Sequence, residues 1–352
     1  MKNYLKIFGV ITLAVIIGFS FFACGDDDSG GGGTGSGNDN GGGGNNPSVN
    51  ITWTTLTASQ LPYIYTGGFI SSVVYGSGMF IAIEADENIY SSDGVTWQKL
   101  PGLTSFRYHS VSYCNDIFFI GTSRGQLFYA TDGIEQEEDW EQLNLSSIFG
   151  AGTNDNINYI SAITYGAGKY VAVGQNGKIA CSDDGISWTE ATGVSITTAI
   201  HSVTFGGGKF IAVGADGKIV SSADGETWTE ITTASFLNQH NIPATMRSVT
   251  YGGGKFVAVG NIFIWHSTDG ETWTKGTSTL FDEGNIPEIR NVIYDGSKFI
   301  AVGRYGRIAW SADGNTWTDI SSDNLDFYGI AFGANRFVAG GQSKRIIYSN
   351  TQ

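Results

Sequence analysis

Proline is scarce in this chain, with five residues among 352, although glycine occurs 51 times. Disordered glycine-rich chains usually carry both residues in quantity, so glycine without proline favours tight turns between ordered segments. Aromatic residues, by contrast, make up 13% of the chain. So many large rings give enough apolar surface for a sizeable core, even if the segments that carry them are short.

Basic residues are also few. The 19 lysines and arginines stand against 33 acidic residues, which gives a formal net charge of −14 at pH 7. Binding to nucleic acid without sequence preference needs a strongly basic face. Nucleic acid is therefore excluded as an expected partner.

Cysteine occurs only three times, and no pair has the spacing of a zinc site. Cys114 and Cys181 belong to different parts of the chain, so we expect two free thiols that are buried or half-buried. The run IEQEED at 134–139 lacks the glycine-punctuated form of a calcium loop and is expected to be a solvated turn. We expect no metal and no cofactor.

One long apolar run is present, at residues 7–23, after two lysines and directly before Cys24. This order is typical of a secretory signal. The sequence FFAC resembles the lipobox of bacterial lipoproteins, in which the cysteine is acylated, although Phe21 stands where leucine is usual. The resemblance implies a signal peptide at 1–23 and a lipid anchor on Cys24 in the outer membrane. A secreted protein without lipid and an uncleaved anchor helix are the alternatives, the latter disfavoured because fewer than ~20 apolar residues are available.

Residues 24–50 follow as a tether of glycine, serine, asparagine and aspartate with almost no apolar side chain. Such a segment cannot form a core, and as a flexible coil it would reach ~25–30 Å from the membrane. The acidic run after Cys24 resembles the surface-export signal of some Gram-negative lipoproteins. It is read equally well as the solvated start of a linker, so cell-surface exposure stays open.

A heptapeptide with an Asp-Gly turn and a closing tryptophan recurs along the rest of the chain. The copies are SSDGVTW, SDDGISW, SADGETW, STDGETW and SADGNTW, which end at Trp97, Trp188, Trp228, Trp273 and Trp317. A looser copy contains Trp140. We expect a hairpin with a type I′ turn, in which both central residues have positive φ, and an aspartate that accepts bonds from amides of its own turn. The tryptophan should be buried against a neighbouring unit.

Each repeat reads as four short strands, and the repeating tryptophans lie 40 to 48 residues apart. This spacing is typical of propeller blades. We expect seven first strands, which begin near Ser72, Ser110, Ala162, Ser202, Ser248, Asn291 and Gly329. The seventh copy ends before its turn and tryptophan, whereas ITWTTL at 51–56 matches a fourth strand. We therefore predict an all-β, monomeric, seven-bladed β-propeller of four-stranded antiparallel blades over 51–352, with the last blade closed by the N-terminal strand.

The repeated SxDGxTW motif resembles the Asp-box, or BNR-repeat, propellers of the sialidase superfamily over essentially all of 51–352, in a form one residue shorter between aspartate and glycine. Such boxes occur in enzymes, binding proteins and photosystem-assembly propellers, so the resemblance implies fold more than function. A sialidase would need an Arg-Ile-Pro motif where GGFISS stands, and three arginines that grip a carboxylate. Arg107 lies one position earlier than Arg247 and Arg290, which turns it to the opposite face.

One position in each first strand is expected to ring a mouth of the central channel. These positions are Ser71, His109, Ser161, His201, Arg247, Arg290 and Tyr328. We predict a binding site made from His109, His201, Arg247, Arg290 and Tyr328, with His201, Arg247 and Arg290 as a positive site for a carboxylate or an anionic sugar. Alternatively, the arginines pair with Glu288, Asp282 and nearby carbonyls and hold loops in place. The longest loops, before blades 3, 5 and 6, open on the same face.

These features predict a lipid-anchored protein of the bacterial envelope whose propeller is a non-catalytic binding or assembly scaffold, with no catalytic residue assigned. Its partners would be the membrane, through the anchor, and an anionic glycan, a carboxylate or a protein. A glycan-binding or sialidase-like glycoside-hydrolase propeller is the alternative. Carboxylates within ~5–10 Å of one another at the mouth would favour the hydrolase. Exposed aromatic rings there would favour sugar binding, and a flat apolar patch a protein partner.

Overall fold

The computed structural model describes most of the chain after residue 50. The described residues are 51–57, 60–62, 68–84, 88–103, 107–131, 133–151, 158–231, 243–261, 263–278, 288–321 and 324–350. The predicted signal peptide, Cys24, the tether and Asp282 lie outside them, as do parts of the three long interblade loops. Across the described residues, no helix has the length and apolar character needed to cross a membrane.

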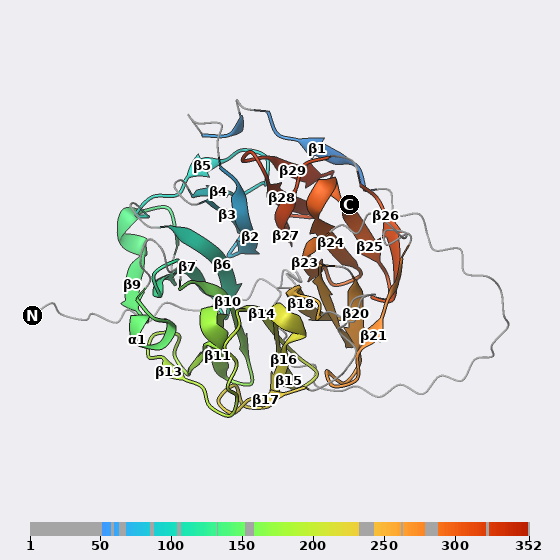
Figure 1. Ribbon diagram of the computed structural model, residues 1–352. Coiled ribbons are helices and arrows are strands. Elements are labelled where there is room, and N and C mark those ends of the chain that lie inside the picture. Colours follow the sequence, from blue (N-terminus) through green and yellow to red (C-terminus); the bar gives the residue numbers. More distant parts are fainter. Residues whose placement is uncertain are drawn as a thin grey trace, which may run out of the picture.

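Seven sheets stand around a centre, each with its first strand innermost (Figure 1). Blades 1 to 3 are β2 (Ile70–Gly76), β3 (Met79–Glu84), β4 (Ile89–Ser91) and β5 (Gln98–Lys99); β6 (Tyr108–Cys114), β7 (Ile117–Thr122), β8 (Gln126–Ala130) and β9 (Glu141–Asn144); and β10 (Ile160–Gly166), β11 (Lys169–Gly174), β12 (Ile179–Ser182) and β13 (Thr189–Glu190). One helical turn, α1 (Ser146–Phe149), follows blade 2.

Blades 4 to 6 repeat the same antiparallel order. They are β14 (Ile200–Gly206), β15 (Lys209–Gly214), β16 (Ile219–Ser222) and β17 (Thr229–Glu230); β18 (Met246–Gly252), β19 (Lys255–Gly260), β20 (Ile264–Ser267) and β21 (Thr274–Lys275); and β23 (Ile289–Tyr294), β24 (Phe299–Gly303), β25 (Ile308–Ser311) and β26 (Thr316–Asp319). The prediction of a seven-bladed propeller with four-stranded antiparallel blades is confirmed.

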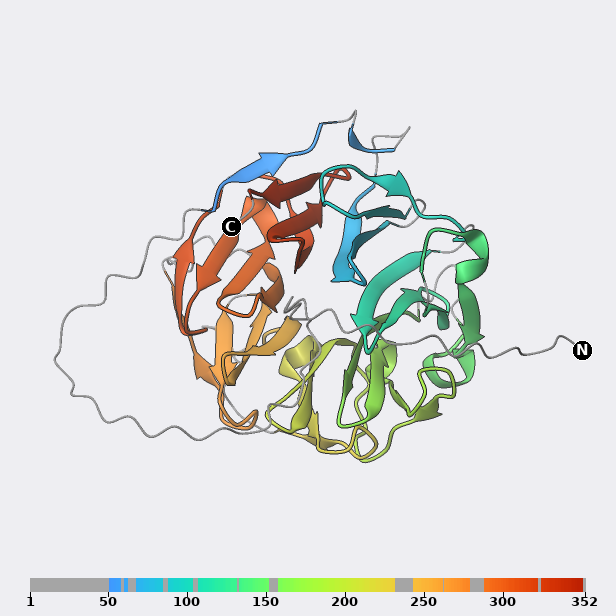
Figure 2. The same cartoon turned by 180° about the vertical axis from the view of Figure 1, so that it is seen from behind.

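Blade 7 is closed by the N-terminal strand, as predicted. Its order is β27 (Phe327–Gly333), β28 (Arg336–Gly341), β29 (Ile346–Ser349) and then β1 (Trp53–Thr55). Trp53 lies opposite Ser349, and the Leu56 amide donates to the Ile346 carbonyl at 3.0 Å. Figure 2 shows β1, in blue, along the outside of the red C-terminal strands. The two ends of the domain thus share one sheet.

Blade 6 departs from the four-strand pattern. The short strand β22 (Thr277–Ser278), which leaves blade 5, pairs in parallel with β26. A similar pairing joins blades 3 and 4, where the Thr192 amide donates to the Glu226 carbonyl at 2.8 Å. In both places a segment leaving one blade caps the outer edge of the next, which removes unpaired backbone groups from that edge.

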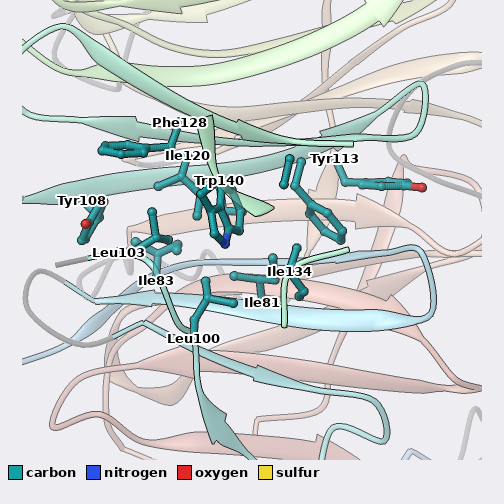
Figure 3. Close-up of a cluster of buried hydrophobic side chains, with 13 residues drawn as sticks. Ile81, Ile83, Leu100, Leu103, Tyr108, Tyr113, Ile120, Phe128, Ile134 and Trp140 are labelled. Atoms are coloured by element: carbon teal, nitrogen blue, oxygen red, sulfur yellow. The ribbon is translucent and has the colours of Figure 1, made fainter. Parts of the chain in front are cut away.

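The core lies between blades. Buried apolar side chains of the described residues form seven clusters, and each cluster joins two neighbouring blades. Figure 3 shows the cluster between blades 1 and 2, where Ile81 and Ile83 of β3 face Ile120, Phe128 and Trp140 of blade 2. Because the clusters run all the way round the ring, no blade has a complete core of its own.

The heptapeptide turns have a different geometry from the type I′ turn we expected. The Ser222 hydroxyl accepts from the Gly225 amide at 2.8 Å, and the Asp224 carboxylate accepts from the Glu226 and Thr227 amides at 2.9 Å. Only the glycine has positive φ, 76° at Gly225. The expectation was wrong because the serine and aspartate side chains take the amides and fix the turn with one left-handed residue. Type I′ geometry occurs instead between second and third strands, as at Asp216 and Gly217.

These turns hold neighbouring blades together. The Trp228 indole N–H donates to the Gly225 carbonyl of its own turn at 3.0 Å, and the ring packs in the cluster between blades 3 and 4. A Cβ added to Gly225 would lie 2.9 Å from Val171 Cγ2 in β11 of the preceding blade. The glycine therefore permits a close approach, and the tryptophan anchors it.

The predictions for the two cysteines and for the IEQEED run are also met. Cys114 and Cys181 are both buried thiols outside any disulfide. Most of the IEQEED run is exposed and contains a short 3₁₀ helix (Glu137–Asp139) whose Asp139 carboxylate accepts from the Gln136 amide at 2.7 Å. The described residues contain no group of three or more histidine, cysteine, aspartate or glutamate side chains that would hold a metal ion.

Candidate functional site

The seven predicted mouth positions share one backbone feature, a β-bulge near the start of each first strand. In β14, Ile200 lies opposite Gly214 and Ser202 opposite Val213, which leaves His201 between them without a partner. The same shift occurs at the corresponding residue of every other blade, namely Ser71, His109, Ser161, Arg247, Arg290 and Tyr328. A bulge redirects the side chain of its extra residue, so the fold presents one redirected side chain per blade at one end of the channel.

A cavity of about 200 Å³ occupies the centre of the ring, lined by the first strands of all seven blades. Only three of the seven bulge residues line it, Ser161, His201 and Arg247. These come from blades 3, 4 and 5, which are consecutive. The others, including Arg290 and Tyr328, lie outside this cavity.

The two histidines of the predicted site are partly buried and neutral at pH 7. Burial lowers the pKa of His109 to about 4, and His201 adds to this effect. Burial, with a smaller effect from the Arg247 guanidinium, lowers the pKa of His201 to about 4. His109 also stacks on Tyr159, with ring centroids 3.7 Å apart. The positive charge predicted for this site therefore comes from the arginines alone.

Both arginines of the predicted site share one carboxylate. Glu288 accepts from Arg247 Nε at 2.7 Å and from Arg290 Nη2 at 3.2 Å, and its side chain is only 14% exposed. The alternative in which these arginines pair with Glu288 is thus the arrangement found. The structure brings Arg247 and Arg290 together, but through an anion of the protein itself.

Two members of this ionic network were missed by sequence reasoning, Arg304 and Asp326. Arg304 Nε lies 3.4 Å from Asp326 Oδ2, and Arg290 Nη2 lies 3.9 Å from the same oxygen. Asp326 directly precedes its first strand, as Glu288 does. The residues that directly precede the first strands form a second set of aligned positions, which also contains Arg107 and Tyr159. Alignment of these positions in the sequence would have found Asp326. Arg304 gave no comparable signal, because it lies in the turn after the second strand of blade 6.

The mouth near blades 7 and 1 is aromatic. The Arg290 guanidinium lies over the Tyr328 ring at 4.4 Å, and the centroid of the Phe69 ring lies 5.2 Å from that of Tyr328. Phe69 remains 50% exposed. Ser71, by contrast, is hydrogen-bonded to the backbone, since its hydroxyl donates to the carbonyl of His109 at 3.1 Å. This part of the mouth therefore presents aromatic ring faces, whereas its charged side chains already pair with one another.

Glu288 and Asp326 are the carboxylates to test for hydrolytic chemistry. Both lie near Arg290 Nη2, at 3.2 and 3.9 Å, which puts their oxygens within roughly 7 Å of each other, in the range of glycosidase acid pairs. Each is, however, bound by arginine side chains, and neither lines the central cavity. The arrangement suits binding better than proton transfer to a substrate in the channel.

Of three comparisons with known proteins, the one with solved structures bears on the fold. A scan against protein-family models finds no match, and neither does a search of the curated proteins. Among solved structures, the chain is similar to YCF48 from Cyanidioschyzon merolae (17% identity, 85% of this chain and 98% of that chain covered, TM-score 0.63) and to YCF48 bound to D1 peptide (17%, 86% and 95%, 0.61). It is also similar to a catalytically inactive virginiamycin B lyase from Staphylococcus aureus with quinupristin (12%, 85% and 99%, 0.67). At these identities the likeness shows a shared seven-bladed β-propeller fold.

Proposed function

We propose that this chain is a bacterial lipoprotein, held at the outer membrane by lipid on Cys24, whose propeller is a non-catalytic binding or assembly scaffold. Its ligand would bind at the channel mouth. The observation that carries this proposal is the ring of seven bulge side chains, three of which line a central cavity. Function in such a fold resides in the side chains that the ring presents rather than in the ring itself.

A protein partner is the ligand class that we favour. One structural neighbour, YCF48, has been solved with a D1 peptide. The mouth of the present chain combines ring faces at Phe69 and Tyr328 with guanidinium groups at Arg247 and Arg290. Aromatic and arginine side chains are the residue types enriched where proteins bind one another.

The repeated SxDGxTW turns support a relationship to Asp-box propellers as part of the same proposal. Five copies share the serine and aspartate bonds to backbone amides and the indole bond to the glycine carbonyl. Since such turns organise the fold in proteins of many activities, they support the architecture of the scaffold and do not assign its ligand.

Capture of partners by the full-length chain, purified in detergent, tests the scaffold function. Bacterial envelope extract and a glycan array would be probed with the wild type and with a Tyr159→Ala, Arg247→Ala double variant at the mouth. Lys209→Ala is the matched control, because Lys209 starts β15 at the opposite end of the ring and pairs with Glu271. We expect capture by the wild type and the control only. Equal capture by all three would place binding elsewhere and contradict the proposal.

The lipid anchor is tested by labelling cells with a fatty-acid analogue. We expect Cys24→Ser to lose the label and to leave the membrane fraction, because the acylated thiol is gone. Cys181→Ser, which changes a buried free thiol, should keep both the label and the location. Continued acylation of the Cys24→Ser protein would contradict the anchor.

Glycan binding is the second candidate, and exposed Phe69 beside Tyr328 favours it. A sugar ring would stack on such a face. In the glycan array, Phe69→Ala should then lose signal, whereas Tyr305→Ala, which removes another exposed ring, should not. A glycoside hydrolase would in addition release product from the retained glycan.

A further inference from the structure

We propose that Ser161, His201 and Arg247 form a subsite for a monocarboxylate group inside the channel cavity. Arg290, which the sequence grouped with His201 and Arg247, belongs instead to the framework around the site. This inference rests on the proposed function, because it names the chemistry that the mouth would recognise. The proposed subsite lies in blades 3 to 5, where hydrogen-bonding groups lack partners, and it excludes the side of the mouth around Arg290 and Tyr328, where the charged groups are already paired.

The first observation is that polar side chains of the residues that line the cavity have hydrogen-bonding atoms without partners. Ser161 Oγ is buried and makes no hydrogen bond to any described residue. Arg247 uses Nε for Glu288, and within the described part of the chain no bond engages its two terminal nitrogens. His201, which is partly buried in the same wall, also has no hydrogen bond to a described side chain or carbonyl. A buried hydroxyl is rarely left without a partner, and its place beside the open terminal nitrogens of Arg247, a side chain 37% exposed, indicates room for a polar ligand.

The second observation is that Arg290 is already engaged. Its Nη2 contacts Glu288 at 3.2 Å and Asp326 at 3.9 Å, and the guanidinium lies over the Tyr328 ring. Its Nε atom is buried without an acceptor among the described residues, but Arg290 does not line the cavity. An incoming anion would have to displace two protein carboxylates to use this arginine. Arg247 meets no such competition at its terminal nitrogens.

Local charge sets the class of ligand. His201 and His109 are neutral at pH 7, because their pKa values are about 4. Arg247, Arg290 and Arg304 together carry three positive charges against two on Glu288 and Asp326, which leaves room for one negative charge. A carboxylate has that charge and two coplanar oxygens, which match the paired terminal nitrogens of an arginine. The hydroxyl of Ser161 and one ring N–H of His201 would serve the remaining lone pairs.

Cavity size agrees with a small group. About 200 Å³ admits a compact carboxylate or the acidic end of a longer ligand, whereas the rest of that ligand would lie across the mouth. The inner end of the cavity is lined by apolar and hydroxyl side chains of the first strands, such as Val203 and Thr250. A dianion would meet the carboxylate of Glu288 with only the terminal nitrogens of Arg247 to offset its second charge.

The test uses sodium benzoate as the probe and benzamide as its uncharged counterpart, with the purified full-length chain and saturation-transfer NMR. We expect benzoate to bind the wild type and benzamide to bind at least about tenfold more weakly. Ser161→Ala should weaken benzoate about fivefold, the loss of one hydrogen bond to an anion. It should leave the melting temperature unchanged or higher, because the lost hydroxyl has no partner in the protein.

Arg247→Gln should weaken benzoate more than about tenfold. Arg304→Gln is the matched control, since Arg304 contacts the same Glu288 at 3.9 Å, is 43% exposed and does not line the cavity. It should change benzoate affinity by less than about twofold. Absence of benzoate binding, equal binding by the wild type, Ser161→Ala and Arg247→Gln, or equal losses in the Arg247 and Arg304 variants would each overturn the subsite.

The same reagents keep this inference apart from the scaffold function. A partner captured through the mouth but not displaced by benzoate would overturn the subsite and leave the scaffold in place. Benzoate binding lost in Ser161→Ala and Arg247→Gln, with no partner captured, would support the subsite and overturn the scaffold.

Discussion

Trp228→Ala and Trp188→Ala form a matched pair that measures what the repeated tryptophan contributes to stability. Both indoles donate to the glycine carbonyl of their own turn, at 3.0 and 2.9 Å. Both also lie near a phenylalanine of a second strand, Phe210 at 6.3 Å and Phe119 at 6.2 Å between centroids. They differ in burial, since Trp228 is 1% exposed and Trp188 is only partly buried. The pair therefore varies burial while the hydrogen bond stays the same.

The expected magnitudes follow from the buried area. A buried tryptophan removes ~150–250 Å² from water, which at ~25 cal/mol per Å² is about 4–6 kcal/mol. Alanine recovers part of this and neighbours relax, so Trp228→Ala should lower the free energy of unfolding by ~3–5 kcal/mol. Trp188→Ala should cost about 2–3 kcal/mol, because part of its ring is already in water.

Equilibrium urea unfolding, followed by near-ultraviolet circular dichroism, measures both values from the transition midpoints and slopes. The difference between the two variants should be about 1–2 kcal/mol. Equal losses would refute the reasoning, because they would mean that the indole hydrogen bond, and not burial between blades, sets the contribution.

Three further predictions address closure, the ionic network and acid stability. Deletion of residues 51–56 should abolish cooperative unfolding in a calorimeter, because it removes the strand that closes blade 7. Deletion of residues 25–46, which removes only predicted tether, should leave the melting temperature unchanged. Equal effects of the two deletions would contradict closure by β1. Glu288→Gln should cost about 1–3 kcal/mol in urea unfolding, because two partly buried arginines lose their anion, and no loss would show that the network is dispensable. Hydrogen bonds from backbone amides of the same turn, of which the Thr272 amide has the largest effect, lower the pKa of Asp269 from 3.8 to about 2. The folded pKa lies below the unfolded one, so this stability is present above about pH 4 and lost towards pH 2; the melting temperature of Asp269→Asn should fall less over that window than that of the wild type.

The sequence was sufficient for the architecture because the decisive signals are local. Each SxDGxTW turn fixes its own geometry through three or four neighbouring residues, and the same spacing recurs in five of the seven blades. ITWTTL could be placed in blade 7 because it matches a fourth strand while the last repeat lacks one. The Trp53 to Ser349 pairing confirms that inference. The seven positions aligned at the starts of the first strands coincide with the bulge residues, although no bulge was predicted there.

The rest depends on contacts that a single repeat does not contain. The turn type was missed because serine and aspartate side chains compete for amides that a type I′ turn leaves free. The partner of Arg247 is Glu288, 41 residues later in the next blade, so sequence could offer that pairing only as one of two alternatives. The histidines looked like sources of charge. Their neutrality comes from burial by adjacent blades, which the sequence does not encode locally.

The bulges connect the fold to the site in physical terms. A regular inner strand would send alternate side chains into the two neighbouring interblade clusters, where Val203 and Val249 lie. The extra residue at each bulge leaves the ladder and presents a side chain at the mouth without taking an apolar residue from the clusters. Substitutions at these seven positions should therefore be tolerated by the core. The residue types at these positions, serine, histidine, arginine and tyrosine, can therefore reflect what the mouth binds. Ser161 has no partner and Arg247 uses only one of its nitrogens, so these two residues point to a ligand more strongly than the paired Arg290 does.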